Sequence, residues 1–318
     1  MISNYIQEWL DVIENMNNDN TYKLAWGRAI LEVLNSKEVT GDVEIHFDEL
    51  SPKIIKYYWN QIYFFNLTQG PIKKPVIEQI VHEMIDKYQK ETNNKIPAWY
   101  EKAETYFSND TNYYKKLISK ISTVLSENVS WRFMHVNGED VDLYKLDNKN
   151  RIITFNKTQA IDLKNHAFVL SQLLNYRWAQ LLELFNTAPR ISSKVKGLSN
   201  SKIRRNNLTK YKKILLKMYK GNPVDFYSGK ILQENDISVD HVIPWSFMYS
   251  DDIWNLVLTS RSENSIKSNS VPSKETIRRL KERNSELLLQ IDDKAEKEKL
   301  EESINNNYID KFYYSMKM

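Results

Sequence analysis

The sequence of 318 residues contains no cysteine, which excludes disulfide bonds and fits a reducing cytoplasm. Glycine and proline are also scarce, at 7 and 8 residues, and this favours a helix-rich chain with few tight turns. No stretch approaches the roughly 18 consecutive apolar residues of a membrane span. Residues 1–17 carry charges within a short amphipathic pattern, where a signal peptide would have an apolar core. We therefore expect a cytoplasmic protein without a membrane segment.

The composition that remains suits a globular protein of two domains. The length allows a sizeable core, and the 41% of hydrophobic residues is usual for soluble proteins. Apolar residues recur at helical spacing through much of residues 1–186, most clearly in 163–186. Residues 141–146 and 151–155 are predicted to form a hairpin. Helical spacing also indicates that most of the 19 tyrosines and 8 tryptophans pack in cores or interfaces rather than stack on bases.

Positive charge is concentrated in one segment. No acidic residue occurs from Asn186 to Val224, whereas eleven of the 45 basic residues lie between Arg190 and Lys220. The rest of the chain, with 34 basic against 41 acidic residues, would carry −7, although the whole chain carries +4. Such a stripe is typical of phosphate-backbone binding, and a solvated helix or linker is the plainer interpretation. The predicted nucleic-acid contacts are Lys194, Lys196, Lys202, Arg204, Arg205, Lys210, Lys212 and Lys213.

Residues 240–267, directly after that segment, combine side chains that suit phosphodiester hydrolysis. This reaction needs a nucleophile, neutralisation of charge on the phosphate, and help for the leaving oxygen. Asp240 offers a hard anionic oxygen and Asn264 a neutral carbonyl oxygen, and both suit Mg²⁺ or Mn²⁺. The imidazole of His241 titrates near neutral pH, which makes it the candidate general base.

The flanking residues predict a compact ββα unit around these side chains. Residues 225–232 indicate a tight turn at Gly229 that enters a short strand, and residues 254–259 have strand propensity. Residues 260–268 predict a short helix, capped by Ser260 or Ser262, that ends before a proline. In such a unit the helix would turn Asn264 toward the strand that carries the Asp-His pair.

This arrangement resembles the HNH family of metal-dependent nucleases, also called ββα-metal nucleases. The DH pair, the two asparagines, the NxxK pattern and the VPS stretch at 271–273 look most similar to the HNH domain of RNA-guided CRISPR effectors. The resemblance covers roughly residues 222–275 and implies that Asp240 and Asn264 bind metal while His241 deprotonates water. It further implies that Asn255 braces the loop and orients His241, and that Lys267 lies near the phosphate. No sign of the other domains of such effectors is found.

One departure from the family concerns a structural metal. Many HNH proteins bind zinc through paired Cys-x-x-Cys motifs, and this chain has no cysteine. We therefore expect Mg²⁺ or Mn²⁺ as the cofactor and no structural zinc. Packing would hold the unit instead, with contributions from aromatic side chains. The candidates are Phe226, Tyr227, Trp245, Phe247 and Trp254.

The fold class that follows is mainly α with a small α+β part. A helical specificity or regulatory domain (1–186) precedes a basic connecting segment (187–221), an HNH ββα-metal nuclease domain (222–275) and a charged C-terminal helix (276–318). The predicted activity is metal-dependent endonucleolytic cleavage of DNA, in a setting of restriction or anti-phage defence, with a homodimer or a protein as partner. Alternatives are a partner-gated subunit of a defence complex, a nucleic-acid-binding protein with an idle HNH fold, and an RNA substrate.

Overall fold

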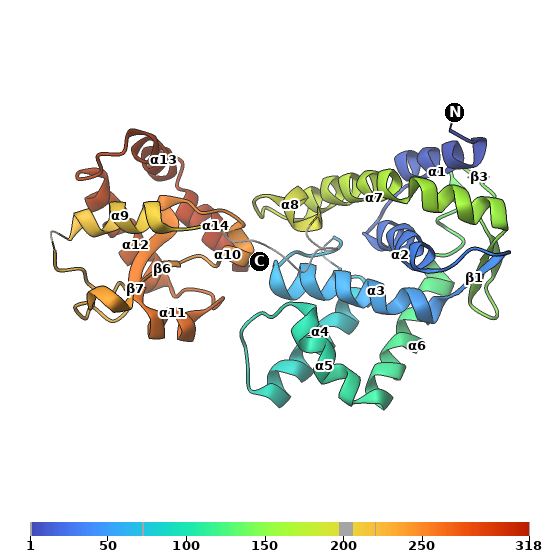
Figure 1. Cartoon of the computed structure of the whole chain (residues 1–318), viewed down its shortest axis with the longest axis horizontal. Coiled ribbons are helices and arrows are strands. Elements are labelled where there is room, and N and C mark those ends of the chain that lie inside the picture. The colour runs from blue at the N-terminus through green and yellow to red at the C-terminus, as the bar shows by residue number, and fades with distance from the viewer. Residues whose placement is uncertain (1, 72, 197–205, 220, 318) are drawn as a thin grey trace. The chain divides into compact units, whose positions relative to one another are not determined.

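The computed structural model describes residues 2–71, 73–196, 206–219 and 221–317. These residues form two compact units (Figure 1), which are described separately. The first unit holds the described residues of 1–94, 98–186 and 191–201, and the second holds those of 95–97, 187–190 and 202–318. No described helix combines the length and the apolar composition that crossing a membrane requires.

The first unit is mainly helical, as the sequence predicts. Its helices are α1 (Asn4–Asn15), α2 (Tyr22–Ser36), α3 (Phe47–Trp59), α4 (Val76–Thr92), α5 (Tyr100–Asn109), α6 (Thr111–Asn128), α7 (Lys157–Phe185) and α8 (Ile191–Lys196). Its strands are β1 (Val43–His46), β2 (His135–Val136), β3 (Glu139–Asp140), β4 (Lys145–Asp147) and β5 (Ile152–Phe155). The predicted hairpin is present as β4 and β5, and β1 pairs antiparallel with the other edge of β5.

Aromatic side chains build much of the core of the first unit. The longest helix, α7, packs against α1, α2 and α8. At the end of α3 the buried ring of Trp59 meets four other rings at centroid distances of 5.1 to 6.1 Å. Those rings belong to Tyr63, Tyr88, Tyr100 and Phe107. Edge-to-face contacts of this kind stabilise a core beyond the area they bury, so these aromatic residues serve packing, as predicted.

The second unit surrounds a two-stranded antiparallel sheet with helices. Its elements are α9 (Thr209–Met218), β6 (Ile237–His241), α10 (Trp245–Met248), β7 (Leu256–Ser260), α11 (Arg261–Lys267), α12 (Lys274–Leu288), α13 (Lys294–Asn305) and α14 (Tyr308–Lys317). The stretch predicted as one charged C-terminal helix is thus divided into three. Asp293 ends the first interruption, because its side chain accepts a hydrogen bond from Glu296 N and caps α13. Asn307, with a φ of 52°, makes the second break in the left-handed region.

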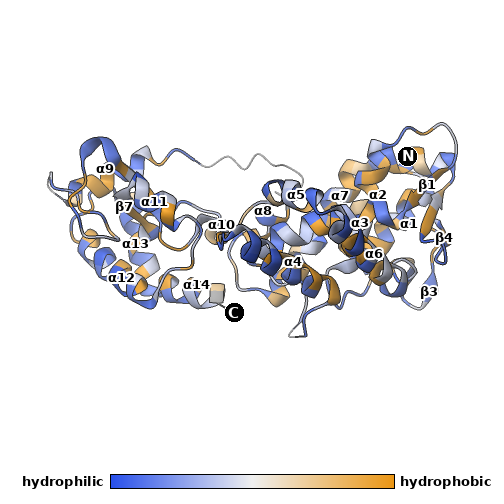
Figure 2. Ribbon diagram, turned by 90° about the horizontal axis from the view of Figure 1, so that it is seen from below, coloured by the Kyte–Doolittle hydropathy of each residue, from blue (hydrophilic) through white to orange (hydrophobic). Residues whose placement is uncertain are grey.

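The three C-terminal helices cover the core of the second unit. In Figure 2 the ribbon of α12 is mostly blue with isolated orange turns, as expected for a helix that buries one narrow stripe. Asn284 in α12 donates its Nδ2 to the carbonyl of Trp254 at 2.8 Å. The core itself contains Phe226, Phe247 and Trp254, three of the aromatic residues that were expected to hold this unit by packing.

The predicted ββα unit is present. Strand β6 pairs with β7 from Ile237 opposite Ser260 to His241 opposite Leu256. Helix α11 follows β7 directly, and its N-cap is Ser260, whose Oγ accepts a hydrogen bond from Glu263 N at 3.1 Å. Helix α9, which lies in the segment predicted as a connection, packs on both strands through the buried Leu215.

Asp225 joins the turn before the sheet to the start of α11. Its side chain is 1% exposed. Oδ1 accepts hydrogen bonds from the N–H groups of Tyr227 and Ser228, at 2.9 Å each. Oδ2 accepts from Thr259 Oγ1 at 2.9 Å and from Ser260 N at 2.7 Å. Burial by itself raises the pKa of this carboxyl, but these hydrogen bonds to the charged form outweigh burial and hold the pKa below its usual range.

Asp225→Asn is expected to lower the free energy of unfolding at neutral pH by about 1–3 kcal/mol, because the charged acceptor of four hydrogen bonds is lost. Because the folded-state pKa is depressed, the stabilising effect is complete above the unfolded value of about 4. It is lost as the pH falls through the folded value. Urea-induced unfolding at several pH values would measure the difference between the wild type and the variant.

The exposed carboxylate of Asp292, whose side chain is 77% exposed, provides the matched control. Asp292→Asn makes the same chemical change at the surface and should alter stability by less than about 0.5 kcal/mol. A difference between the wild type and Asp225→Asn that stays constant on acidification would contradict the assignment of this charge to folding.

Candidate active site

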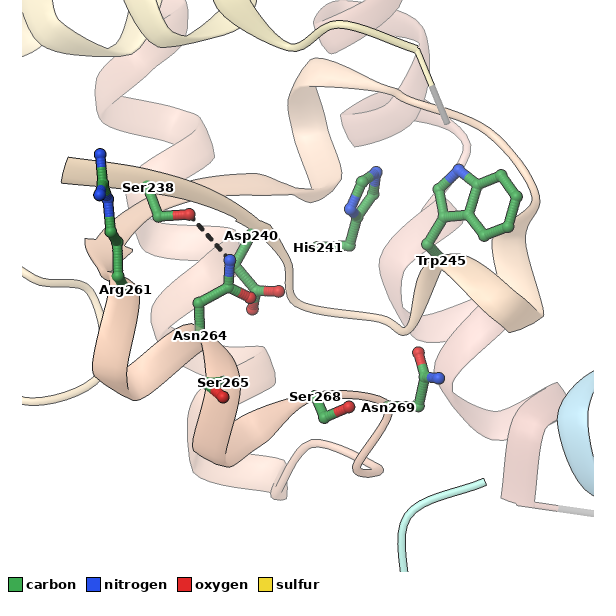
Figure 3. Close-up of a pocket in the computed structure, with 9 residues that line it drawn as sticks. All are labelled: Ser238, Asp240, His241, Trp245, Arg261, Asn264, Ser265, Ser268 and Asn269. Atoms are coloured by element: carbon green, nitrogen blue, oxygen red, sulfur yellow. Dashed lines mark hydrogen bonds between the residues drawn. The ribbon is translucent and has the colours of Figure 1, made fainter. Parts of the chain in front are cut away.

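A pocket of about 410 Å³ lies where β6 and α11 meet, and it brings three of the predicted site residues together (Figure 3). Asp240, His241 and Asn264 all line it. The other lining residues are Ser238, Trp245, Arg261, Ser265, Ser268 and Asn269. Asn255 and Lys267, the remaining predicted residues, are outside this lining and contact the backbone around it.

Asp240 stands near the end of β6 with one carboxylate oxygen fixed by the protein. Oδ2 accepts a hydrogen bond from the Tyr227 hydroxyl at 2.5 Å and lies 3.0 Å from Lys267 Nζ. Burial, with the charge of Asp240 added, raises the pKa of Tyr227 far above its usual range, so this hydroxyl remains a donor. Both contacts that the structure describes for the carboxylate end on Oδ2, and Oδ1 is the oxygen left for the pocket.

Asn264 is oriented by a serine on the facing strand. Its Nδ2 donates to Ser238 Oγ at 2.8 Å, the bond drawn as a dashed line in Figure 3. Because the nitrogen is engaged with Ser238, the amide oxygen is turned to the other side of the group, toward Asp240. Ser238 lies two residues before Asp240, and alternate residues of a strand share a face. The pair of Asp240 and Asn264 therefore presents two hard oxygen atoms to one space.

These two oxygen atoms fit a divalent cation that keeps most of its shell for water and phosphate. Mg²⁺ is commonly held by one or two protein oxygen ligands in this way. Within the described part of the chain, no cluster of three or more His, Cys, Asp or Glu side chains could hold a metal ion. A metal at this pocket would thus depend on one carboxylate and one amide, and an all-carboxylate or imidazole cage is not available among the described residues.

His241 makes a hydrogen bond that the sequence does not predict. Its Nε2 lies 2.8 Å from Asp251 Oδ1, and the two side chains are only 7% and 6% exposed. With Nε2 engaged in this way, Nδ1 is the ring nitrogen available to the pocket. The arrangement leaves a proton acceptor in reach of a water molecule next to Asp240 and Asn264.

Asn255 holds the backbone that follows His241. This buried side chain accepts a hydrogen bond from Ile243 N through Oδ1, and it donates through Nδ2 to Ile243 O, each at 2.8 Å. Its own carbonyl accepts from Val242 N at 2.9 Å. Asn255 therefore braces the loop, and it acts on His241 through the backbone, because none of its described hydrogen bonds reaches the imidazole.

Lys267 is bound within the protein rather than directed into the pocket. Its Nζ donates to His241 O at 2.6 Å and pairs with Asp240 Oδ2 at 3.0 Å, with 12% of the side chain exposed. Contact with a phosphate, which the resemblance implies, would require these bonds to open. Arg261 lines the pocket at the first turn of α11 and is exposed, so a cation is present there that the sequence did not single out.

The predicted nucleic-acid contacts fall into different surroundings. Lys194 is completely buried, and burial lowers its pKa to about 7, so its side chain is not a surface cation. Lys210 pairs with Asp293 and Glu296 of the C-terminal helices, and Lys212 donates to the carbonyl of Ile237 at 2.8 Å. Lys213 is exposed. Lys202, Arg204, Arg205 and the side chain of Lys196 lie outside the described residues.

The residues that the sequence analysis missed are Ser238, Asp251 and Arg261. Ser238 could have been found, because strand alternation places it on the same side as Asp240. Asp251 gave no such signal, since a loop of irregular backbone separates it from His241. Arg261 stands at the start of a predicted helix, where an acidic residue is more usual than a cation.

Comparisons with known proteins agree with the geometry of this segment. Residues 218–273 match the model of the HNH endonuclease family. CRISPR-associated endonuclease Cas9 of Streptococcus mutans serotype c is 42% identical over 73 residues, which are 22% of this chain and 5% of the relative. The protein of the same name from Listeria innocua serovar 6a is 36% identical over 85 residues, 26% of this chain and 6% of the relative.

The similarity is confined to a small part of both partners. The chain spans only 5 to 6% of the length of these relatives. No solved structure matches the chain significantly. The resemblance to HNH nucleases is nevertheless confirmed for the segment that carries the pocket, and it supports a nuclease.

Proposed function

We propose that this protein is a metal-dependent endonuclease that hydrolyses phosphodiester bonds in DNA. The observation that carries the proposal is the common pocket of Asp240, His241 and Asn264, each held from outside by another side chain. Functional groups fixed in this way need little reorganisation when substrate binds, which is a condition for efficient catalysis.

Asp240 and Asn264 are the residues that would hold the metal. Their oxygen atoms are the donor type that Mg²⁺ and Mn²⁺ prefer. A divalent cation, when bound, would neutralise charge on the phosphate and on the leaving oxygen. The Tyr227 hydroxyl and the Lys267 ammonium hold Asp240 ionised and oriented before any cation arrives.

His241 is the group that would activate water. The imidazole takes a proton from the water at Nδ1 while the water oxygen bonds to phosphorus. The bond from phosphorus to the leaving oxygen then breaks, and that oxygen takes a proton from solvent. The guanidinium of Arg261, at the rim of the same pocket, is suited to the charge that accumulates on the phosphate oxygens.

The choice of DNA and the biological setting rest on coarser arguments. The concentration of basic residues before the site suits a phosphate backbone, and exposed Lys213 belongs to it. RNA shares that chemistry and is the second substrate to test. The relatives are CRISPR-associated endonucleases by name, which favours anti-phage defence or restriction as the setting. One ββα site cuts one strand, so cleavage of both strands would need two copies.

A partner-gated nuclease subunit is the second candidate, and one surface favours it. Helix α7 exposes three large apolar or aromatic side chains, Phe168 at 77%, Tyr176 at 60% and Leu184 at 78%. Exposed apolar groups of this size often mark contact with another protein. An idle HNH fold has no such support, because all five predicted site residues are present in their expected surroundings or bound to the backbone of the site.

His241→Ala is expected to lower the cleavage rate of supercoiled plasmid in Mg²⁺ or Mn²⁺ by a factor of about 10²–10⁴, because the proton acceptor is removed. Gel analysis of nicked and linear products, with EDTA as the metal-free control, measures the effect. His135→Ala, at an exposed histidine of the β2–β3 hairpin, is the matched control and should cleave like the wild type. Equal cleavage by both variants would sink the assignment of the base.

Ser238→Ala should raise the metal concentration needed for half-maximal cleavage by about 10- to 100-fold, since the Asn264 amide loses the partner that fixes its oxygen. Titration of Mg²⁺ at saturating DNA provides the measurement. Ser262→Ala, at an exposed serine in the first turn of α11 whose Oγ contacts Ser260 Oγ, is the control. An unchanged metal requirement in Ser238→Ala would argue against Asn264 as a ligand.

Lys213→Gln is expected to weaken DNA binding equally for all sequences. It should also reduce the slope of log affinity against log salt by about 1, because one phosphate contact releases fewer counterions. Binding measured by fluorescence anisotropy at several salt concentrations tests this. Lys145→Gln, an exposed lysine of the first unit, makes the same charge change outside the basic segment. Identical salt slopes for both variants would remove Lys213 from the interface.

A further inference from the structure

We infer that Asp251 is a positioning residue for the general base. It fixes the ring of His241 and keeps the neutral imidazole in the tautomer with the proton on Nε2. The inference deepens the proposed nuclease function and rests on it for its catalytic meaning. The structural part of the inference, the tautomer of His241, can be measured whether or not the protein cleaves nucleic acid.

The contact between the two side chains is short and shielded from water. Asp251 Oδ1 lies 2.8 Å from His241 Nε2, and neither side chain is more than 7% exposed. A hydrogen bond to a charged acceptor is strong, and in such surroundings water competes with it poorly. An ionised carboxylate only accepts, so the imidazole must donate from Nε2. The lone pair of the neutral ring is then on Nδ1.

Asp251 is itself held in place by the segment that precedes the sheet. Its Oδ2 accepts a hydrogen bond from Asn206 Nδ2 at 2.8 Å, and its carbonyl accepts from the Tyr211 hydroxyl at 2.7 Å. The carboxylate therefore has one oxygen for the histidine and one for an asparagine. Neither the loop nor the carboxylate can turn without breaking one of these contacts.

The neighbouring aspartate shows that this geometry is specific to one position. Asp252 carries the same group one residue later, and its Oδ2 accepts a hydrogen bond from Ser250 Oγ at 2.5 Å. That contact stays within the loop and does not reach the imidazole. Asp252 therefore provides a control with the same charge and nearly the same location.

The catalytic consequence is a stable place for the proton that leaves water. When Nδ1 takes the proton, the ring becomes a cation, and the adjacent carboxylate stabilises it without taking a proton itself. The proton count is unchanged at Nε2, and the only new bond to hydrogen forms at Nδ1. A ring with the opposite tautomer would present an N–H group to the water and could not accept its proton.

Asp251→Asn gives the sharpest test because its outcome has a direction. Asn206 still needs an acceptor, so the new amide is expected to turn its oxygen to Asn206 and its nitrogen to His241. A donor facing Nε2 would force the ring proton to Nδ1. ¹⁵N NMR of the histidine side chains, with the imidazoles neutral, should show Nε2–H in the wild type and Nδ1–H in Asp251→Asn. Asp252→Asn should retain the wild-type tautomer.

Single-turnover cleavage at saturating DNA provides the functional arm. Asp251→Asn should lower the rate by about 10²–10⁴, the range of the corresponding change in a serine protease triad. KM should stay within about twofold, since the effect concerns the chemical step. Tyr211→Phe removes one hydroxyl and keeps the carboxylate, and it should lower the rate several-fold without reversing the tautomer. This milder variant keeps the test informative if Asp251→Asn does not fold.

The two arms separate failure of this inference from failure of the proposed function. Wild-type Nε2–H with a reversed tautomer in Asp251→Asn supports the positioning role, even if no preparation cleaves DNA or RNA. Absence of cleavage in that case counts against the nuclease alone. A wild-type ring protonated on Nδ1, a tautomer unmoved by Asp251→Asn, or equal rates for Asp251→Asn and Asp252→Asn would overturn the inference.

Discussion

Four hydrogen bonds converge on the buried carboxylate of Asp225, and they join parts of the chain that must meet before a site can form. One oxygen fixes the turn that carries Tyr227, and the other fixes the junction of β7 and α11. Tyr227 then reaches Asp240, while α11 carries Asn264 and its turn toward the same strand. A shift at this carboxylate would move both metal-binding candidates relative to each other, which links the stability of the unit to its chemistry.

The same logic recurs at each functional side chain. Asp240 is held through one oxygen, Asn264 through its nitrogen and His241 through Nε2, so in each the atom that faces the pocket is the remaining one. Lys267 and Asn255 act on the backbone between these groups and keep the end of β6 in register. The protein thus builds the geometry from its own hydrogen bonds, and binding of a cation would complete the site without creating it.

How much of this the sequence predicts depends on the range of the interactions. The strands, the α11 cap at Ser260 and the meeting of Asp240 with Asn264 follow from spacing and turn chemistry within a few tens of residues. The bond from Asp251 to His241 depends on the path of an irregular loop, which periodicity does not describe. The division of the C-terminal stretch into three helices was missed because the caps at Asp293 and Asn307 interrupt an otherwise helical charge pattern.

The lysines of α9 show why a count of charge does not give a binding surface. Lys210 and Lys212 flank Tyr211, and they are anchored to α13 and to the start of β6 respectively. Ion pairs with Asp293 and Glu296 cancel the charge that Lys210 would offer to phosphate. Their anchoring has another effect, because it holds α9 where the Tyr211 hydroxyl reaches the Asp251 carbonyl. These two lysines would therefore serve the catalytic centre by fixing position, whereas exposed Lys213 retains its charge for a nucleic-acid backbone.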